Sequence, residues 1–211
     1  MRTIIIAAFM CLASLPVSAA EARAQLEAFL RDLSSMSARF NQRVLDESGK
    51  LVENSAGEFF VQRPGKFRWS YTQPYAQEII GTADRVWLYD SDLEQVSIKP
   101  IDDALGNSPA LLLVSDRPLD ELFEVRDLGE QNAVLWLELK PRNENGAFAS
   151  FRIGMADGVL RLMELMDNFG QRTQLSFADV NRNPTLKAEL FTFTPPPGAD
   201  VVGDVPAANK Q

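Results

Sequence analysis

Residues 61–71 place a Pro-Gly turn between two segments in which apolar and polar side chains alternate. In the second segment Phe67, Trp69 and Tyr71 occupy every other position, so one face of the segment is aromatic and the other is polar. Proline presets φ at the first central position of a type II turn, and glycine accepts the positive φ at the second. The stretch therefore predicts a β-hairpin. Whether Arg63 shares the aromatic face depends on the loop length, which the sequence leaves open.

Runs with the same two-residue period recur along most of the chain, and most are separated by turn-forming residues. They lie at residues 36–45, 52–63, 66–71, 78–82, 85–89, 94–99, 123–127, 133–140, 147–155, 160–167 and 172–178. Strands joined by such short turns must be antiparallel neighbours. A mainly β fold follows, in which one meander of about eleven strands either closes into a barrel or curls strongly.

Two segments have a helical pattern. In residues 21–33 the side chains of Leu26, Phe29 and Leu33 form one apolar stripe, which predicts an amphipathic helix. Ser108 and the proline after it are a typical helix start, and the run that follows, residues 110–114, is apolar on all sides. This second helix must be buried. It either lies across the concave face of the sheet, forming a lid with the first helix, or plugs one end of a barrel as an ordinary core helix.

The first 19 residues have the pattern of a cleaved secretory signal peptide, with Arg2, an apolar run and small residues before a cleavage site after Ala19. The apolar run is shorter than the roughly 20 residues that a membrane-spanning helix needs. Cys11 follows Met10 inside this run, whereas the cysteine of a lipoprotein signal follows a small residue. We expect an exported chain in which residues 20–211 form a single domain, since no Pro-rich or Gly/Ser-rich linker divides them.

The composition excludes most catalytic chemistry. The sequence has no histidine, and Cys11 is its one cysteine, so Ser-His-Asp and Cys-His sites and most zinc sites are excluded. Asp90, Asp92 and Glu94 have the spacing of a calcium loop but lack its glycine, and a hairpin turn explains them better. A net charge of −8 without a basic stripe argues against nucleic acid. We expect no catalytic residue, metal or cofactor.

Aromatic and methionine side chains remain as the candidate binding surface. Any one of them is more typical of ordinary core, but together they suggest a cavity. The residues expected at this cavity or its rim are Phe40, Phe60, Phe67, Trp69, Tyr71, Trp87, Leu111 and Leu112.

Five motifs in this order and spacing resemble one protein family. They are A-R-F-N-Q at residues 38–42, R-P-x-x-F-x-W at 63–69 with Gln-Pro after it, V-W-L-Y at 86–89, L-G-N-S-P-A-L-L-L at 105–113 and F-T-F-T-P-P-P-G at 191–198. With a signal peptide in front of them, the chain is similar to the periplasmic outer-membrane lipoprotein carrier family, LolA, from its first helix to its last strand.

This resemblance implies an incomplete antiparallel β-barrel of about eleven strands with a helical lid, whose apolar interior shields lipoprotein acyl chains in the periplasm. It implies two partners, an inner-membrane ABC-type complex that releases lipoproteins and an outer-membrane receptor that accepts them. Arg63 would hold the lid closed in the unloaded state, and Phe67 would lie at the mouth where cargo or partners are met. We expect a monomer.

Further expectations concern particular residues. Arg63 should donate hydrogen bonds to carbonyls after Ser108, because a guanidinium near an apolar cavity must find acceptors. Trp69 should be better buried than Phe67, which lies closer to the turn. Residues 201–211 lack a clear strand pattern. Two other functions remain open at this point. One is an envelope regulatory or sensory protein of similar fold that binds lipid or a lipoprotein without transporting it. The other is a lipid esterase, which the absence of a nucleophile and base disfavours.

Overall fold

The computed structural model describes residues 18–82, 84–105, 110–142, 148–167 and 169–203. Residues 1–17, which belong to the expected signal peptide, and the expected helix start at Ser108 lie outside these residues. The helices are α1 (Ser18–Arg31), α2 (Ile101–Leu105), α3 (Ala110–Val114), α4 (Leu119–Leu122) and the 3₁₀ helix η1 (Ala188–Phe191). The strands are β1 (Ser35–Leu45), β2 (Leu51–Gln62), β3 (Lys66–Gln73), β4 (Gln77–Gly81), β5 (Arg85–Asp90), β6 (Gln95–Pro100), β7 (Phe123–Gln131), β8 (Val134–Pro141), β9 (Phe148–Ala156), β10 (Val159–Asp167), β11 (Arg172–Arg182) and β12 (Asp200–Gly203).

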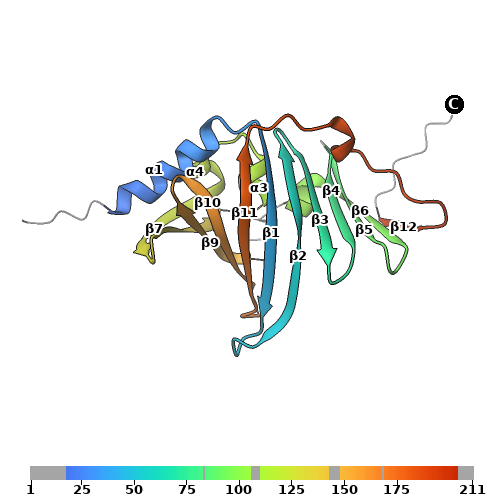
Figure 1. The fold of residues 1–211 in the computed structure, drawn as a ribbon, viewed down its shortest axis with the longest axis horizontal. Coiled ribbons are helices and arrows are strands. Elements are labelled where there is room, and N and C mark those ends of the chain that lie inside the picture. Colours follow the sequence, from blue (N-terminus) through green and yellow to red (C-terminus); the bar gives the residue numbers. More distant parts are fainter. Residues whose placement is uncertain (1–17, 83, 106–109, 143–147, 168, 204–211) are drawn as a thin grey trace, which may run out of the picture.

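All twelve strands belong to one open sheet with the order β12-β6-β5-β4-β3-β2-β1-β11-β10-β9-β8-β7 (Figure 1). Every strand pair within β1 to β11 is antiparallel. Consecutive strands are neighbours throughout the predicted meander except β6 and β7, and the pairing of β1 with β11 joins its two halves. The result is an incomplete barrel, mainly β with short helices, as expected.

The twelfth strand answers a question that the sequence left open. Residues 201–211 lack a clear strand pattern, but β12 pairs in parallel with β6 and places Val201 beside Val96. An edge strand of four residues does not need the apolar alternation of a half-buried strand, because only its backbone must pair. Residues 204–211 lie outside the described residues.

The predicted hairpin is formed by β2 and β3. Val61 pairs with Phe67 and Phe59 with Trp69, while Gly65 in the turn has a φ of 72°. Side chains of paired residues point to the same face of a sheet, so the aromatic face of β3 continues onto β2. This face is the inner, concave side of the sheet.

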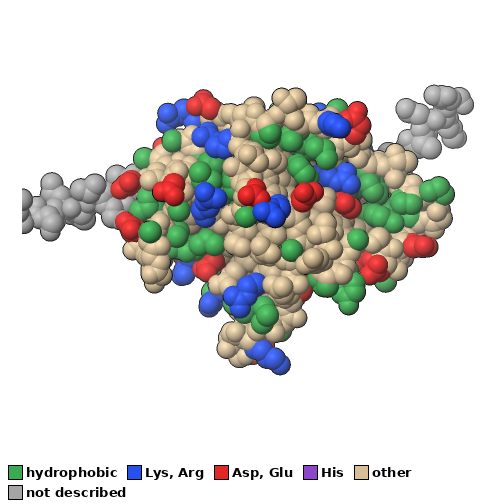
Figure 2. Space-filling view, viewed as in Figure 1, with side chains coloured by type: hydrophobic (Ala, Val, Ile, Leu, Met, Phe, Trp, Pro, Cys, Tyr) green, Lys and Arg blue, Asp and Glu red, His purple; other side chains and the backbone are tan. Residues whose placement is uncertain are grey.

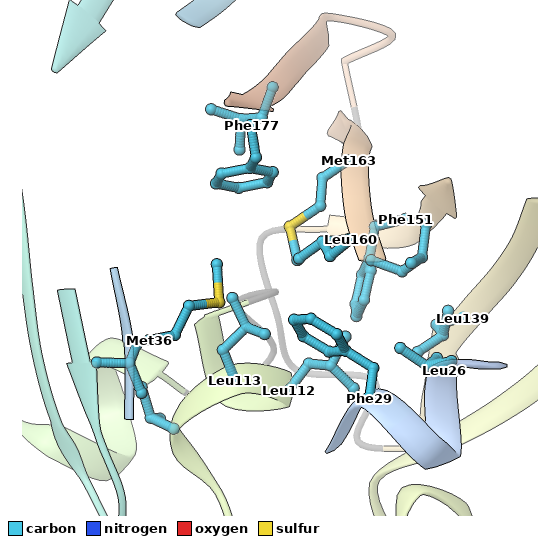
Figure 3. Packing of buried hydrophobic residues seen from close by; sticks show 14 of the residues in the cluster. Leu26, Phe29, Met36, Leu112, Leu113, Leu139, Phe151, Leu160, Met163 and Phe177 are labelled. Carbon is cyan, nitrogen blue, oxygen red and sulfur yellow. The ribbon is translucent and has the colours of Figure 1, made fainter. Parts of the chain in front are cut away.

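Helices α1 and α3 cover the inner face with apolar side chains. Phe29 of α1 and Leu113 of α3 are each 1% exposed, and they point toward side chains of the sheet such as Phe151 and Met163 (Figure 3). Burying a side chain of this size stabilises the fold by about 1.5–3 kcal/mol. The described part of the chain therefore has a helical layer over the concave face. No helix in this part is long and apolar enough to cross a membrane.

The outer face of the sheet is polar by contrast. Acidic and basic side chains lie next to one another on it, with apolar side chains between them (Figure 2). One such pair, Arg39 of β1 and Asp179 of β11, joins the two halves of the sheet. Because both partners are largely exposed, this pair contributes at most about 1 kcal/mol. The inner face therefore dominates the stability of the fold.

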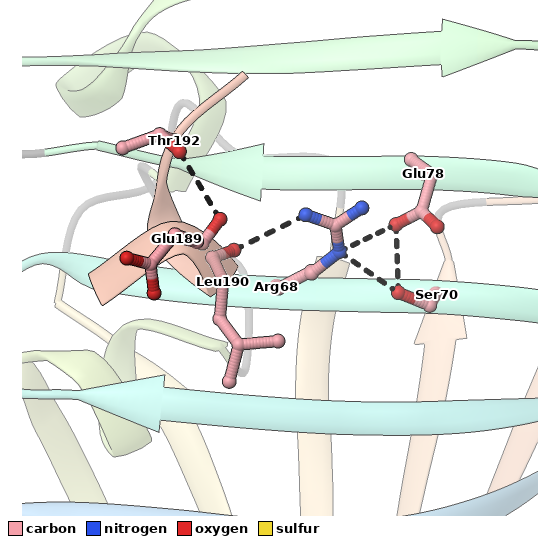
Figure 4. A network of polar contacts seen from close by, with 6 residues as sticks. All are labelled: Arg68, Ser70, Glu78, Glu189, Leu190 and Thr192. Carbon is pink, nitrogen blue, oxygen red and sulfur yellow. Dashed lines mark hydrogen bonds and ion pairs between the residues drawn. The ribbon is translucent and has the colours of Figure 1, made fainter. Parts of the chain in front are cut away.

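The chain after β11 runs over the outer face of β3 to β5. Arg68 donates hydrogen bonds to Glu78 and to the carbonyl oxygen of Leu190, at 3.0 and 3.2 Å, and Ser70 donates to the same carboxylate (Figure 4). This network attaches η1 to the side of the sheet that faces away from the helices.

A close approach inside the sheet gives a first prediction. Gly57 lies opposite Phe40, and a Cβ on it would lie 1.9 Å from the carbonyl oxygen of Ser70. Gly57→Ala should therefore lower the free energy of unfolding by about 1–3 kcal/mol, measured by urea denaturation. Glu58→Ala, at the exposed neighbouring position, should change it by less than about 0.5 kcal/mol. Similar values for both variants would show that the sheet relaxes around Gly57 at little cost.

Candidate functional site

The inner face contains an apolar pocket of about 330 Å³ beneath the helical layer. Strands from both halves of the sheet contribute to it, together with α2 and α3. It is lined by Gln42, Phe67, Trp69, Tyr71, Ile79, Val86, Ala104, Leu105, Ala110, Leu165, Thr173 and Leu175. Most of these side chains are aliphatic or aromatic and none is charged, so the pocket suits a hydrocarbon ligand.

An aromatic cluster forms the wall of the apolar pocket on the β3 side. The ring centroid of Trp69 lies 4.5 Å from that of Phe59 and 4.9 Å from that of Phe40. The ring of Tyr71 contacts Phe40 edge-on, with 5.1 Å between the centroids. Phe40 and Phe59 are fully buried and support the half-buried Trp69 and Tyr71, which face the pocket. Such tilted contacts hold large rings in defined positions.

Polar atoms occur at one end of this wall. The Tyr71 hydroxyl donates a hydrogen bond of 3.0 Å to Oε1 of Gln42. Burial and the nearby negative charge of Glu53 raise the pKa of Tyr71 to about 12, so the hydroxyl stays protonated at neutral pH. The indole nitrogen of Trp69 is buried without an acceptor among the described residues, at a cost of about 1–3 kcal/mol.

Arg63 connects the β2–β3 turn to the helical layer. Its Nε donates to the carbonyl oxygen of Leu113 at 2.8 Å, its Nη2 to Leu112 at 2.9 Å and its Nη1 to Leu30 at 3.0 Å. The bonds to α3 were expected from the sequence, and the bond to α1 was not. Burial lowers the pKa of the guanidinium below its ordinary value, and the charge of Asp116 partly offsets this effect. Arg63 therefore lies on the aromatic, helix-covered face, which the sequence had left open.

The order of burial between Phe67 and Trp69 is the reverse of the expectation. Phe67 is 3% exposed, whereas Trp69 is only half-buried. The reason is Gly81 on the neighbouring strand: a Cβ there would lie 2.1 Å from the Phe67 ring, so the ring occupies the space that a side chain would fill. Phe67 nevertheless lines the apolar pocket.

With this geometry established, comparisons with known proteins identify the family. A family model for the outer membrane lipoprotein carrier protein LolA matches residues 31–194. The chain belongs to the LolA family. The match includes Arg63 and eleven of the twelve described strands in full, from β1 to β11.

Individual relatives agree with the family match. An outer-membrane lipoprotein carrier protein of Methylococcus capsulatus is 44% identical over 182 residues, covering 86% of this chain and 88% of its own. One of Dechloromonas aromatica is 40% identical over 195 residues, covering 92% and 94%. Among solved structures, an uncharacterized conserved protein of Thermus thermophilus has a TM-score of 0.55 at 16% identity, covering 87% of this chain and 97% of its own. This last likeness concerns the fold alone.

Two residues expected at the cavity lie instead on the outer face of this LolA-family sheet. Phe60 pairs with Arg68 on the face opposite to Phe59. Trp87 packs against Phe193 of the C-terminal segment, with 5.7 Å between the ring centroids and a tilt of 49° between the ring planes. Both expectations were wrong because adjacent residues of a strand face opposite sides, and only the pairing register decides which of them faces inward.

The two leucines expected from α3 have other positions. Leu112 is 3% exposed and lines a separate groove beside Arg63, while Leu111 is half-buried and packs against the core. The residue of α3 that lines the apolar pocket is Ala110. A five-residue helix that is apolar on every side gives no stripe from which to choose the facing residue.

Sequence reasoning missed Gln42 as a residue of the pocket. It lies two positions after Phe40 in β1 and therefore shares the inner face with it, a signal that was available. Leu165 and Leu175, which come from β10 and β11, could not have been assigned in this way. They reach the pocket only because β11 pairs with β1.

Proposed function

We propose that this LolA-family protein is a periplasmic carrier that binds the acyl chains of lipoproteins and carries them between the inner and the outer membrane. The observation that carries the proposal is the uncharged apolar pocket beneath a helical layer. Such a pocket replaces the apolar surroundings that an acyl chain loses when it leaves a membrane. The relatives named as lipoprotein carriers support the same function.

The energetics of acyl transfer require partners. Each buried methylene is worth roughly 0.8 kcal/mol, so a chain of about 15 methylenes is held in a membrane by roughly 12 kcal/mol. A carrier that binds by similar apolar contacts cannot extract several such chains unaided. The proposal therefore includes an inner-membrane ABC-type complex that releases the lipoprotein and an outer-membrane receptor that accepts it.

Within this proposal Arg63 locks the helical layer over the empty pocket, and Phe67 contacts the cargo. Residues 1–19 are the cleaved signal peptide and residues 20–211 the single carrier domain, acting as a monomer without catalytic activity. Support for the lock is the set of three bonds that Arg63 makes to carbonyl oxygens of α1 and α3.

Co-purification tests the proposal. The full chain, expressed with its leader in a bacterium that has an outer membrane, should be recovered from the periplasm with its amino terminus near Ala20 and with lipoprotein bound in a stoichiometric complex. Mass spectrometry measures both. The same chain without residues 1–19, made in the cytoplasm, is the control and should carry none. A lipid-modified start at Cys11, or purification without lipoprotein, would contradict the carrier.

A further inference from the structure

A second pocket adjoins the apolar one and has the opposite character. It has a volume of about 420 Å³ and shares two lining residues, Gln42 and Tyr71, with the apolar pocket. Its other lining residues include Glu53, Ser55 and Asp90. We refer to it as the polar pocket. Because the two pockets share the hydrogen-bonded pair of Tyr71 and Gln42, that pair forms the boundary between them.

The side chains on the inner face change from apolar to polar along the direction of β1 and β2. On the inner face of β1, Phe40 is followed two positions later by Gln42, and Ser55 of β2 lies directly opposite Gln42. Ser55 is 3% exposed and donates a hydrogen bond of 3.1 Å to Glu53, which is two positions further along β2. Since inner-face residues recur with a period of two, one step along each strand takes a ligand from an aromatic wall to amide, hydroxyl and carboxylate groups.

The charged side chains that line the polar pocket are negative. The carboxylates of Glu53 and Asp90 line it, and no lysine or arginine occurs among the described residues of its lining. A phosphate held there would face like charges without a cation to pair with, which raises its free energy. An uncharged head group that offers amide N–H and carbonyl groups has no such penalty.

We propose that the two pockets form one amphipathic site, in which an acyl chain lies in the apolar pocket and the uncharged linkage between chain and peptide lies in the polar pocket. This inference rests on the proposed carrier function and adds a specificity to it. The acylated amino-terminal cysteine of a lipoprotein has a linkage of this kind, whereas a phospholipid with the same chains has a phosphate at that position. The site selects lipoprotein anchors over membrane phospholipids.

Competition binding tests the inference on the purified mature chain. The probes are a dipalmitoylglyceryl-cysteine peptide, phosphatidylglycerol with two palmitoyl chains, and an apolar fluorescent dye that reports the apolar pocket. The parent should bind the lipopeptide at least tenfold more tightly than the phospholipid. Glu53→Lys should bring the two affinities to within about threefold of each other, mainly by tightening phospholipid binding. Glu58→Lys, on the outer face of the same strand, should keep the parental ratio.

Gln77→Leu provides the second arm, because Gln77 lines the polar pocket and is not among the residues lining the apolar one. It should weaken lipopeptide binding by about threefold to tenfold, the effect of one hydrogen bond, and leave dye binding unchanged. An unchanged ratio in Glu53→Lys, or equal losses for lipopeptide and dye in Gln77→Leu, would overturn the inference while leaving the carrier function intact. A parent chain that does not bind the lipopeptide would instead overturn the proposed function.

Discussion

Arg63→Leu should leave the sheet folded and release the helical layer from its inner face. The substitution removes three hydrogen bonds from one cation, to the carbonyl oxygens of Leu30, Leu112 and Leu113. Hydrogen bonds that involve a charged group contribute about 1.5–3 kcal/mol each. Even one such contribution shifts an equilibrium between closed and open arrangements about tenfold or more toward the open one.

Two measurements check this expectation. Amide hydrogen exchange in α3 should accelerate at least tenfold, while exchange in β1 and β11 stays at the parental rate. Transfer of lipoprotein from the loaded carrier to the outer membrane should fall. A helical layer that no longer closes over the apolar pocket does not compete with the bound acyl chain, so the cargo is released less readily.

Arg68→Leu is the matched control. Arg68 also donates to a backbone carbonyl, that of Leu190, but on the outer face of the sheet. Its loss should affect the attachment of η1 and not exchange in α3 or lipoprotein hand-off. Parental exchange and hand-off in Arg63→Leu would show that Arg63 only supports the turn, and the role as a lock would be abandoned.

Phe67→Glu should strongly weaken acyl-chain binding. It should lower the free energy of unfolding by much less than is usual for replacing a side chain that is only 3% exposed. The Phe67 side chain lines the apolar pocket, so a carboxylate in its place can keep water in the empty pocket. An acyl chain that enters must remove this water from a charge, at a cost of several kcal/mol. The affinity for a dipalmitoyl lipopeptide should therefore fall by more than about 100-fold.

Two controls separate the pocket from the ordinary core. Phe59→Ala removes a ring that is 0% exposed and does not border the pocket, so it should lower the free energy of unfolding by about 3–5 kcal/mol. Trp69→Ala should cost less than Phe59→Ala, because Trp69 is half-buried. Urea denaturation gives the stabilities, and fluorescence titration gives the affinities. A Phe67→Glu variant that unfolds as readily as Phe59→Ala would place Phe67 in the ordinary core.

The strands and turns of this protein could be predicted because they depend on local properties. Period-two alternation between turn-forming residues located eleven strands to within a few residues, and the amphipathic stripe of Leu26 and Phe29 located α1. The strand β12 was missed because an edge strand that pairs only through its backbone leaves no such pattern.

The candidate site was predictable only in part. The hydrogen bonds of Arg63 were predictable, because a guanidinium group beside an apolar face needs acceptors and finds them in backbone carbonyls. The facing of adjacent residues was not predictable in the same way. In Phe59-Phe60 and in Val86-Trp87 both residues are apolar, so composition could not show which one turns inward.

Local sequence thus determined the secondary structure, the apolar character of one face and the absence of histidine chemistry. Tertiary structure alone decided the shape of the site. Pairing of β1 with β11 brings Leu175 to the same pocket as Trp69, although the two are far apart in the chain. The pairing of β2 with β3 likewise brings Glu53 and Tyr71 to the same polar pocket. The physical reason is that register and strand order depend on the combined burial of many residues, and no short segment carries that information by itself.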